Sequence, residues 1–270
     1  MSKLFSFASW NVEHFANNKE RIKENVQFIM GSNPDVFAVF EVEGKDVFGS
    51  FVEFMPTHNF FITEDLSRMS TLVGVNRRLT AFITQRQKFK SEIPTLRPGA
   101  LVTLTINDEH YSILFLHMKS SPNPHSWGLR DDMIGHVISL KRALDRAPGA
   151  PPHGANFICA GDFNTMGMNV TYSDKDMDGA EELGRYVRRL RQKRMRLLSK
   201  TADHTWWGGT ESYRPSNLDH VFASDALEFS KFDGAEILVC GWPELPAETE
   251  QINWIEGHSD HAMLYGEVCD

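Results

Sequence analysis

The chain has 270 residues, of which 41% are hydrophobic and 24% charged, as is typical of a soluble globular protein with one large or two small α/β domains. Its net charge of −8 excludes a surface that binds polyanions everywhere, but not a local basic patch. It has no apolar run near the roughly 20 residues of a membrane span, no recognisable signal peptide and no metal-site spacing among its three cysteines, so we expect a cytoplasmic protein without stable membrane insertion.

Strand-like apolar runs alternate along the chain with segments whose apolar residues recur every three to four positions, as in amphipathic helices. In chain order we predict strands at 4–12 and 36–41 around a helix at 19–30, hairpin strands at 100–106 and 111–117, a helix at 130–144, a strand at 157–160, a helix around 180–199, and strands at 218–224 and 262–268. This alternation predicts an α/β protein. We expect a single domain over residues 1–270, because chemically related strand ends lie on both sides of the Pro/Gly-rich loop at 147–155.

Six of the predicted strands have a carboxylate, an amide or an imidazole at one end. In α/β proteins, ligands collect beyond the ends of buried strands, where loops leave a rigid sheet. One such residue is usually only a turn former, but six favour a shared site. The residues are Asn11, Glu41, His117, Asp162 with Asn164, Asp219, and Asp260 with His261.

These side chains suit a hard divalent cation that acts on a phosphate. Carboxylates such as Glu41 and Asp260 favour Mg²⁺ or Mn²⁺, which keep several waters and share their remaining positions with phosphate oxygens. Zinc fits less well, because the chain has neither an H-E-x-x-H motif nor paired cysteines. Ser259 next to Asp260 and His261 suggests a serine hydrolase, but there is no G-x-S-x-G elbow and the three residues are direct neighbours.

In order along the chain, six motifs resemble those of the metal-dependent endonuclease/exonuclease/phosphatase superfamily. They are SWNV (9–12), PDVFAVFE (34–41), LHMKS (116–120), GDFN (161–164), LDHVFAS (218–224) and SDHAML (259–264). The resemblance implies a four-layer α/β sandwich, with two packed, mainly antiparallel β-sheets flanked by helices and the site at one edge. It also implies that Glu41 is the main metal ligand, that Asn11 lies close to metal and phosphate, and that Asp260 is a second carboxylate on the metal side.

The remaining roles that the resemblance implies belong to the hydrolysis of a phosphodiester by an activated water. Asp162 would orient or deprotonate that water, and Asn164 would help to hold water and phosphate. His261, oriented by Asp219, would contact the scissile phosphate. His117 would stabilise phosphate or protonate the leaving group; a plain polar end to the strand is the alternative. Such a reaction needs a positioned nucleophile, charge neutralisation and help for the leaving group.

The resemblance does not fix the substrate. Residues 214–222, RPSNLDHVF, lack the W-x-D-R-like motif of the inositol-phosphatase branch, and 165–174 depart from the A-H-x-x-x-D pattern of the exonuclease III branch. The sequence HMKS followed by Arg130 is similar to bacterial non-specific nucleases. Lys119 and Arg130 are therefore candidate phosphate contacts, although Arg130 could equally be a surface arginine at a helix start.

Residues 184–200 hold eight arginines and lysines, and we predict an amphipathic helix with a basic outer face. Such a face could follow a nucleic-acid backbone, with Arg188 and Arg189 among the contacts. It would also suit an anionic membrane surface, or be merely solvated. Trp207, with Trp206, could stack on splayed bases, but for Trp206 packing in the core is the more natural expectation.

The leading hypothesis is a Mg²⁺- or Mn²⁺-dependent nuclease that cleaves DNA or RNA by in-line attack of water. The alternative is a phosphodiesterase or phosphatase acting on a lipid head group or a small phosphorylated molecule. A catalytically silent binding module is a third, which the intact set of site residues disfavours. We expect nucleic acid as the substrate partner, a monomer, and no obligate protein partner.

Overall fold

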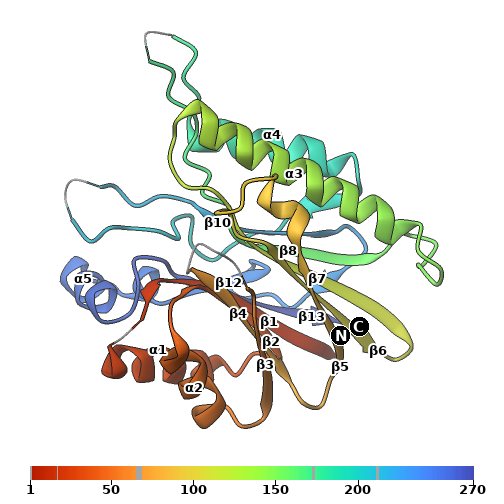
Figure 1. Cartoon of the computed structure of the whole chain (residues 1–270), viewed down its shortest axis with the longest axis horizontal. Helices are drawn as coiled ribbons and strands as arrows, with labels where there is room; N and C mark the ends of the chain where they lie inside the picture. Colours follow the sequence, from red (N-terminus) through yellow and green to blue (C-terminus); the bar gives the residue numbers. More distant parts are fainter. Residues whose placement is uncertain (1, 17, 65–68, 172–173, 211–212) are drawn as a thin grey trace.

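Two β-sheets pack face to face, and helices cover the outer face of each, in a computed structural model that describes residues 2–16, 18–64, 69–171, 174–210 and 213–270. Figure 1 shows the four layers, with α1 and α2 on one outer face and α3 and α4 on the other. Only β1 with β2 and β7 with β8 pair in parallel among the described strand pairs. The predicted four-layer α/β sandwich with mainly antiparallel sheets is confirmed.

The larger sheet has the strand order β11-β13-β1-β2-β4-β3, with β12 also paired to β13, and the smaller has the order β5-β6-β7-β8-β10-β9. The larger consists of β1 (Lys3–Phe15), β2 (Val36–Val42), β3 (His58–Ile62), β4 (Ser70–Asn76), β11 (Glu228–Phe229), β12 (Ile237–Cys240) and β13 (Met263–Cys269). The smaller consists of β5 (Thr80–Arg86), β6 (Gly99–Ile106), β7 (Glu109–His117), β8 (Asn156–Asp162), β9 (Met195–Leu197) and β10 (Asp219–Ser224).

The helices lie outside the sheets and are held there by apolar faces. They are α1 (Lys19–Ser32), α2 (Lys45–Phe54), α3 (Pro124–Asp145), α4 (Gly179–Arg191) and α5 (Glu248–Gly257), with short 3₁₀ turns η1 (Gln87–Lys90) and η2 (Trp242–Glu244). The predicted apolar face of α1 packs on the larger sheet, and α3 and α4 pack on the smaller. In the part of the chain that the structure describes, no helix is both long and apolar enough to cross a lipid bilayer.

The predicted helix over 184–200 is wrong in its second half. α4 ends at Arg191, and Arg194 takes a left-handed backbone conformation with φ of 54°. Residues Met195–Leu197 then form β9, whose backbone pairs with β10. Met195 is fully buried, and the burial of such a side chain together with strand pairing outweighs the few tenths of a kcal/mol by which helix propensities differ.

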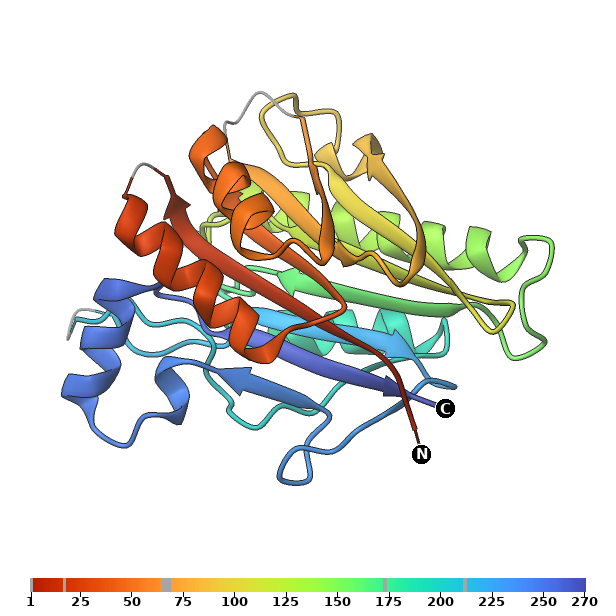
Figure 2. The ribbon, with the colours of Figure 1, turned by 90° about the horizontal axis from the view of Figure 1, so that it is seen from below.

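The core between the sheets determines which strand residues can reach the site. Successive side chains of a strand point to opposite faces, and Phe115 of β7, Ala160 of β8 and Val221 of β10 all point into the core between the sheets. Both chain ends lie together at one end of the larger sheet, where Lys3 pairs with Cys269 (Figure 2). The site forms at the other end.

Gly161 allows β7 and β8 to approach each other just before the site. It lies directly opposite Leu116 in the parallel pair and has a φ of 149°. A Cβ atom at this position would lie 1.9 Å from the carbonyl oxygen of Leu116. Because that oxygen belongs to the backbone of a core strand, it cannot move aside cheaply. The sequence GDFN therefore needs its glycine for the fold as well as its polar residues for the site.

We expect Gly161→Ala to lower the free energy of unfolding by roughly 2–4 kcal/mol, because the added methyl group forces two core strands apart. Denaturant unfolding followed by circular dichroism would measure the change. The control is Gly128→Ala in α3, where the added Cβ meets no atom within 4 Å and stability should stay the same or rise slightly. Equal stability of the two variants would contradict this explanation.

Candidate active site at the seam of the two sheets

Three predicted site residues form one row across the smaller sheet. Asp162 at the end of β8 lies directly opposite His117 of β7 and Asp219 of β10. Each is two residues away from a core residue on its strand, so all three side chains face the larger sheet. All three are buried, and Asp162 is only 1% exposed. Pairing and strand alternation alone therefore bring together residues that are far apart in sequence.

The larger sheet supplies the opposite side of the site. Asn11, on β1, donates from Nδ2 to Asp162 Oδ2 at 3.1 Å and to Glu41 Oε1 at 3.4 Å. The same Nδ2 lies 3.5 Å from Nε2 of His261, which precedes β13. Ser259 fixes this corner, since its hydroxyl donates to the Asn11 carbonyl at 2.7 Å and accepts from the His261 amide. One buried amide thus links groups from both sheets.

Two site residues have a left-handed backbone conformation, which asparagine tolerates but glutamate disfavours. Glu41 has a φ of 59° and Asn164 a φ of 48°, in the left-handed region. Each is held by hydrogen bonds: the His14 amide donates to Glu41 Oε2 at 3.0 Å, and the Asn164 amide donates to Asp162 Oδ1 at 2.9 Å. Strain of this kind costs of order 1–3 kcal/mol and is concentrated at functional sites. For glutamate in particular, it favours a role for the side chain.

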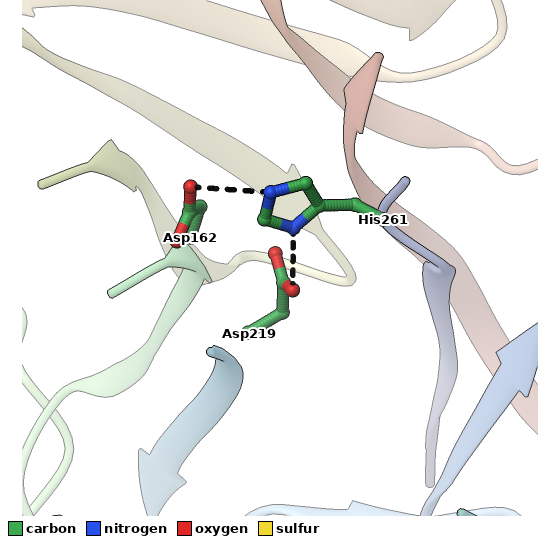
Figure 3. Close-up of side chains that lie close together, drawn as sticks. All are labelled: Asp162, Asp219 and His261. Carbon is green, nitrogen blue, oxygen red and sulfur yellow. Dashed lines mark hydrogen bonds and ion pairs between the residues drawn. The ribbon is translucent and has the colours of Figure 1, made fainter. Parts of the chain in front are cut away.

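His261 lies between two carboxylates, as Figure 3 shows. Its Nδ1 is 2.9 Å from Asp219 Oδ2, and its Nε2 is 3.8 Å from Asp162 Oδ2. Burial alone would lower the pKa of His261, but the charges of Asp219 and Asp162 outweigh it and raise the pKa to about 10. The ring is therefore an imidazolium at neutral pH.

In Asp162, by contrast, the effect of burial on the pKa outweighs the effect of the neighbouring charges. Burial raises the pKa of this carboxyl to about 7, while His261 and hydrogen bonds from Asn11 and the Asn164 amide lower it. Asn164 also donates from Nδ2 to Asp162 Oδ2 at 2.8 Å and to the carbonyl of Met118 at 3.2 Å. Asp162 can thus take up or release a proton near neutral pH, and its orientation is fixed by two amides.

His117 stays neutral although carboxylates are near. Its Nε2 lies 3.5 Å from both Glu41 Oε1 and Asp162 Oδ2. Burial and the positive charges of Arg97, His261 and Lys119 hold the pKa of His117 well below its usual value. A neutral imidazole can donate a hydrogen bond to phosphate, but it carries no extra proton for a leaving group.

Oxygen ligands for a hard cation lie on the Glu41 side of the site. Asp260 accepts from the Trp206 indole at Oδ2 (2.6 Å), while its buried Oδ1 has no hydrogen-bond partner among the described residues. Ligand atoms of Asp162, Asp219 and His261 also lie within 4.8 Å of one another and could hold a metal. Glu41 and Asp260 offer further carboxylate oxygens, the type of ligand that a hard divalent cation prefers.

Two charged residues near the site escaped the sequence analysis. Arg97, just before β6, is close enough to lower the pKa of His117. Partial burial raises the pKa of Glu13, and the nearby carboxylates of Asp260 and Glu41 raise it further, so Glu13 adds a carboxylate on this side of the site. The only signal for Glu13 was its place two residues after Asn11, and Arg97 had none, because nothing local relates residue 97 to the strand ends.

The predicted substrate contacts near the site have different surroundings. Lys119 is partly exposed and close enough to His117 to influence its pKa. Arg130 has no exposed surface and is ion-paired with Glu182, so it is neither a surface arginine nor accessible to a substrate. Trp207, rather than Trp206, is the tryptophan packed in the core, which reverses the sequence expectation; Trp206 is partly exposed beside the site.

The basic segment runs away from the site. α4 begins beside it, since Gly179 packs against the carbonyl of Thr165, directly after GDFN. The segment after α4 reaches the far end of β10, where Met195 pairs with Ser224. A helix of 13 residues is about 20 Å long. Most of these positive charges therefore lie well away from the row of site residues.

The two arginines named from sequence differ in their contacts. Arg188 is exposed, whereas Arg189 is partly buried and forms an ion pair with Asp131 of α3. Further along, Arg196 is ion-paired with Glu236. A nucleic acid could contact Arg188 only if it extended from the site along α4.

We expect Asp219→Asn to lower the pKa of His261 by more than one unit, because Asp219 is the strongest of the groups that raise it. The nuclear magnetic resonance (NMR) titration of the His261 ring, in metal-free protein, would measure the shift. In the wild type the ring should stay protonated until the pH approaches about 10. Asp225→Asn, just beyond the other end of β10 and exposed, should leave the titration unchanged. An unaltered His261 titration in Asp219→Asn would refute the assigned cause.

Solved structures of known proteins share this fold. Truncated TDP2 from Caenorhabditis elegans superposes with a TM-score of 0.67 at 13% identity, over 98% of both chains. TDP2 from D. rerio complexed with single strand DNA product gives 0.64 at 15% identity, over 98% of this chain and 99% of that one. A mannosyl-6-phosphatase from Bacteroides thetaiotaomicron gives 0.62 at 14% identity, over 98% and 100%.

These identities establish a shared fold and nothing more specific. Among curated proteins, none matches this chain by sequence. The model of the Endonuclease/Exonuclease/phosphatase family, by contrast, matches residues 8–234, which include most of the site. With the four-layer fold and the polar row at the seam of its sheets, this match shows that the chain belongs to the endonuclease/exonuclease/phosphatase family.

Proposed function

We propose that this protein is a metal-dependent phosphodiesterase that cleaves nucleic acid. The observation that carries the proposal is the buried carboxylate of Asp162, held by two amides and facing the imidazolium of His261. This arrangement supports a role for Asp162 as a base for water and for His261 as a cation for phosphate, next to each other. Attack of water on a phosphodiester requires both, at the same point in space.

Asp162 is the proposed base. Its pKa of about 7 suits the uptake of a proton near neutral pH, where a base is both ionised and basic enough to be useful. Asn11 and Asn164 direct its Oδ2 atom. The proton from the attacking water goes to this carboxylate, and the water oxygen forms the new bond to phosphorus. The bond from phosphorus to the leaving oxygen breaks at the same time, and that oxygen departs with the electron pair and takes a proton from solvent.

His261 is the proposed cation for the phosphate. Asp219 occupies its Nδ1, so the N–H at Nε2 is free to donate to a non-bridging oxygen. Neutral His117 donates a further hydrogen bond, and Lys119 and Arg97 contribute positive charge from the smaller sheet. These groups offset charge that accumulates on the phosphate oxygens in the transition state.

Glu41 and Asp260 are the proposed ligands of Mg²⁺ or Mn²⁺, with Asn11 beside them. When bound, the ion neutralises negative charge on phosphate and leaving oxygens. Asp260 Oδ1 lies 3.9 Å from His261 Nε2 but accepts no hydrogen bond from the described residues. This atom and the strained backbone of Glu41 support the assignment.

Nucleic acid is the proposed substrate because a structure with the same fold, that of D. rerio TDP2, contains single-strand DNA product. The exposed Arg188 and the edge of Trp206 could contact a strand that extends from the site. The alternative is a small phosphorylated molecule or lipid head group, and the mannosyl-6-phosphatase with this fold makes a sugar phosphate the first such compound to test.

We expect the protein to cleave plasmid, single-stranded DNA or RNA with Mg²⁺ or Mn²⁺ and to lose this activity with EDTA. Asp162→Asn and His261→Gln should each reduce kcat by at least about 100-fold, because each removes a group needed in the transition state. Exposed Asp108, in the β6–β7 turn, provides the control variant Asp108→Asn, which should keep full activity.

The same assay should be run with three other phosphoesters: mannose 6-phosphate, sphingomyelin and a phosphoinositide. Turnover of one of these with no cleavage of any nucleic acid would replace the proposed substrate with the alternative. If wild type and Asp162→Asn cleave nucleic acid equally, the proposed mechanism is wrong.

We expect Mn²⁺ to raise the thermal unfolding midpoint of the wild type but not of Glu41→Gln, because a ligand that binds only the folded state stabilises it. The variant keeps the shape of the side chain and loses its charge. Differential scanning fluorimetry with a Mn²⁺ series would measure the shift. Glu53→Gln, on an exposed position of α2, should respond to Mn²⁺ as the wild type does. A Glu41→Gln response equal to that of the wild type would exclude Glu41 as a main ligand.

A further inference from the structure

A fully buried ion pair connects the two outer helices of the smaller sheet. Arg130 on α3 and Glu182 on α4 are both 0% exposed. They form two parallel hydrogen bonds, Nε to Oε1 at 2.7 Å and Nη2 to Oε2 at 2.9 Å. The hydroxyl of Tyr186 also donates to Glu182. None of these side chains belongs to the catalytic row.

The pair holds the backbone of two loops. Arg130 Nη1 donates to the carbonyls of Lys119 (3.1 Å) and Ser121 (2.8 Å), and Nη2 donates to the carbonyl of Gly167 (2.7 Å). The Gly167 amide in turn donates to Glu182 Oε2 at 2.8 Å. All five N–H groups of the guanidinium are thus used, three of them on backbone carbonyls, and both polar backbone groups of Gly167 are bound.

These loops carry site residues. One follows β7 directly after His117, and the other follows β8 and contains Asn164. Near the site, the side-chain Nδ2 of Asn164 in the second loop donates to the carbonyl of Met118 in the first. The ion pair joins the same two loops a few residues farther on. Gly167 lies so close to neighbouring backbone that a Cβ would be 2.0 Å from the carbonyl of Met177.

Stability alone is a poor reason for this arrangement. Removing two charges from water is costly, and well-packed apolar residues often stabilise a core as well as a buried ion pair does. What apolar residues cannot do is bind three carbonyls and one amide in a fixed geometry. The hydrogen bonds therefore give the pair a role in fixing the loop backbone.

We infer that Arg130 and Glu182 are positioning residues, which hold the loops after β7 and β8 so that Lys119 and Asn164 face the reacting phosphate. The inference rests on the proposed phosphodiesterase activity, since it deepens the account of that site. A displacement of about 1 Å in such groups can cost about 100-fold in rate.

Arg130→Lys tests the inference, because lysine keeps the charge next to Glu182 but cannot reach all three carbonyls. We expect kcat to fall roughly 10- to 100-fold while KM changes less than about threefold, in a protein that remains folded at the assay temperature. Glu182→Gln is the milder second variant. It keeps the shape of the side chain and should also lower kcat. Unchanged kcat in either folded variant would overturn the inference.

The control is a second ion pair of the same helix, between a buried lysine and a partly exposed carboxylate. Lys141 is 1% exposed and is ion-paired with Asp145, whose Oδ1 also accepts from the Ala155 amide at 2.8 Å. This pair holds the loop at 146–155, at the other end of α3 from the site. Lys141→Met should therefore lower stability and leave kcat unchanged. If kcat falls equally in Lys141→Met, general destabilisation explains the effect and positioning does not.

A measurement independent of activity separates this inference from the proposed function. With ¹³C-methyl methionine, Met118 and Met166 report on the two loops, and Met55 reports on the opposite helical layer. Arg130→Lys should shift the first two NMR signals and leave Met55 in place. Unshifted Met118 and Met166 signals would overturn the inference even if the wild type proved inactive on every phosphoester, a result that would by itself contradict only the proposed function.

Discussion

The rest of the site depends on the burial of one negative charge, that of Asp162 between the two sheets. With almost no access to water, this carboxylate stays ionised only if neighbours replace its hydration. Asn11 and Asn164 supply hydrogen bonds, and His261 supplies a positive charge. His261 in turn needs Asp219 to remain charged while buried. The charge of Asp162 thus depends on His261, and the charge of His261 depends on Asp219.

The two histidines of the site are chemically different because their neighbours differ. His261 is bonded to one carboxylate and close to a second, and both favour its charged form. In His117, burial lowers the pKa of the ring, and the positive charges of Arg97, His261 and Lys119 lower it further. The site therefore contains one imidazolium and one neutral imidazole at the same pH. A phosphate can be held by the first without losing the second as a hydrogen-bond donor.

Much of the site was predictable because strand alternation is a local rule. Asp162 continues the inward row of a strand whose apolar residues are visible in sequence, and the same holds for Asn11 and His117. The order of the six motifs predicted the four layers. Nothing in the sequence, however, gave the register that places His117 opposite Asp162, since register depends on pairing across the sheet.

The sequence-based predictions that were wrong concern residues whose surroundings are formed by distant parts of the chain. A local count of charges could not show that Arg130 meets Glu182, 52 residues away, or that β9 interrupts the basic helix. Trp206 and Trp207 point to different environments because neighbouring side chains of an extended segment alternate, and sequence alone did not say which one faces the core. Long-range pairing decided each case.

Because the site is assembled from both sheets, it exists only while they are docked. Asn11 lies on β1 of the larger sheet and His261 just before its strand β13, whereas Asp162 and Asp219 belong to the smaller sheet. Slight local opening at this end would admit water around Asp162, return its pKa toward that of an ordinary carboxyl and separate it from His261. Such an opening would abolish the chemistry while most of each sheet remained intact. Loss of activity would therefore precede loss of secondary structure, so that this site reports on the docking of the sheets.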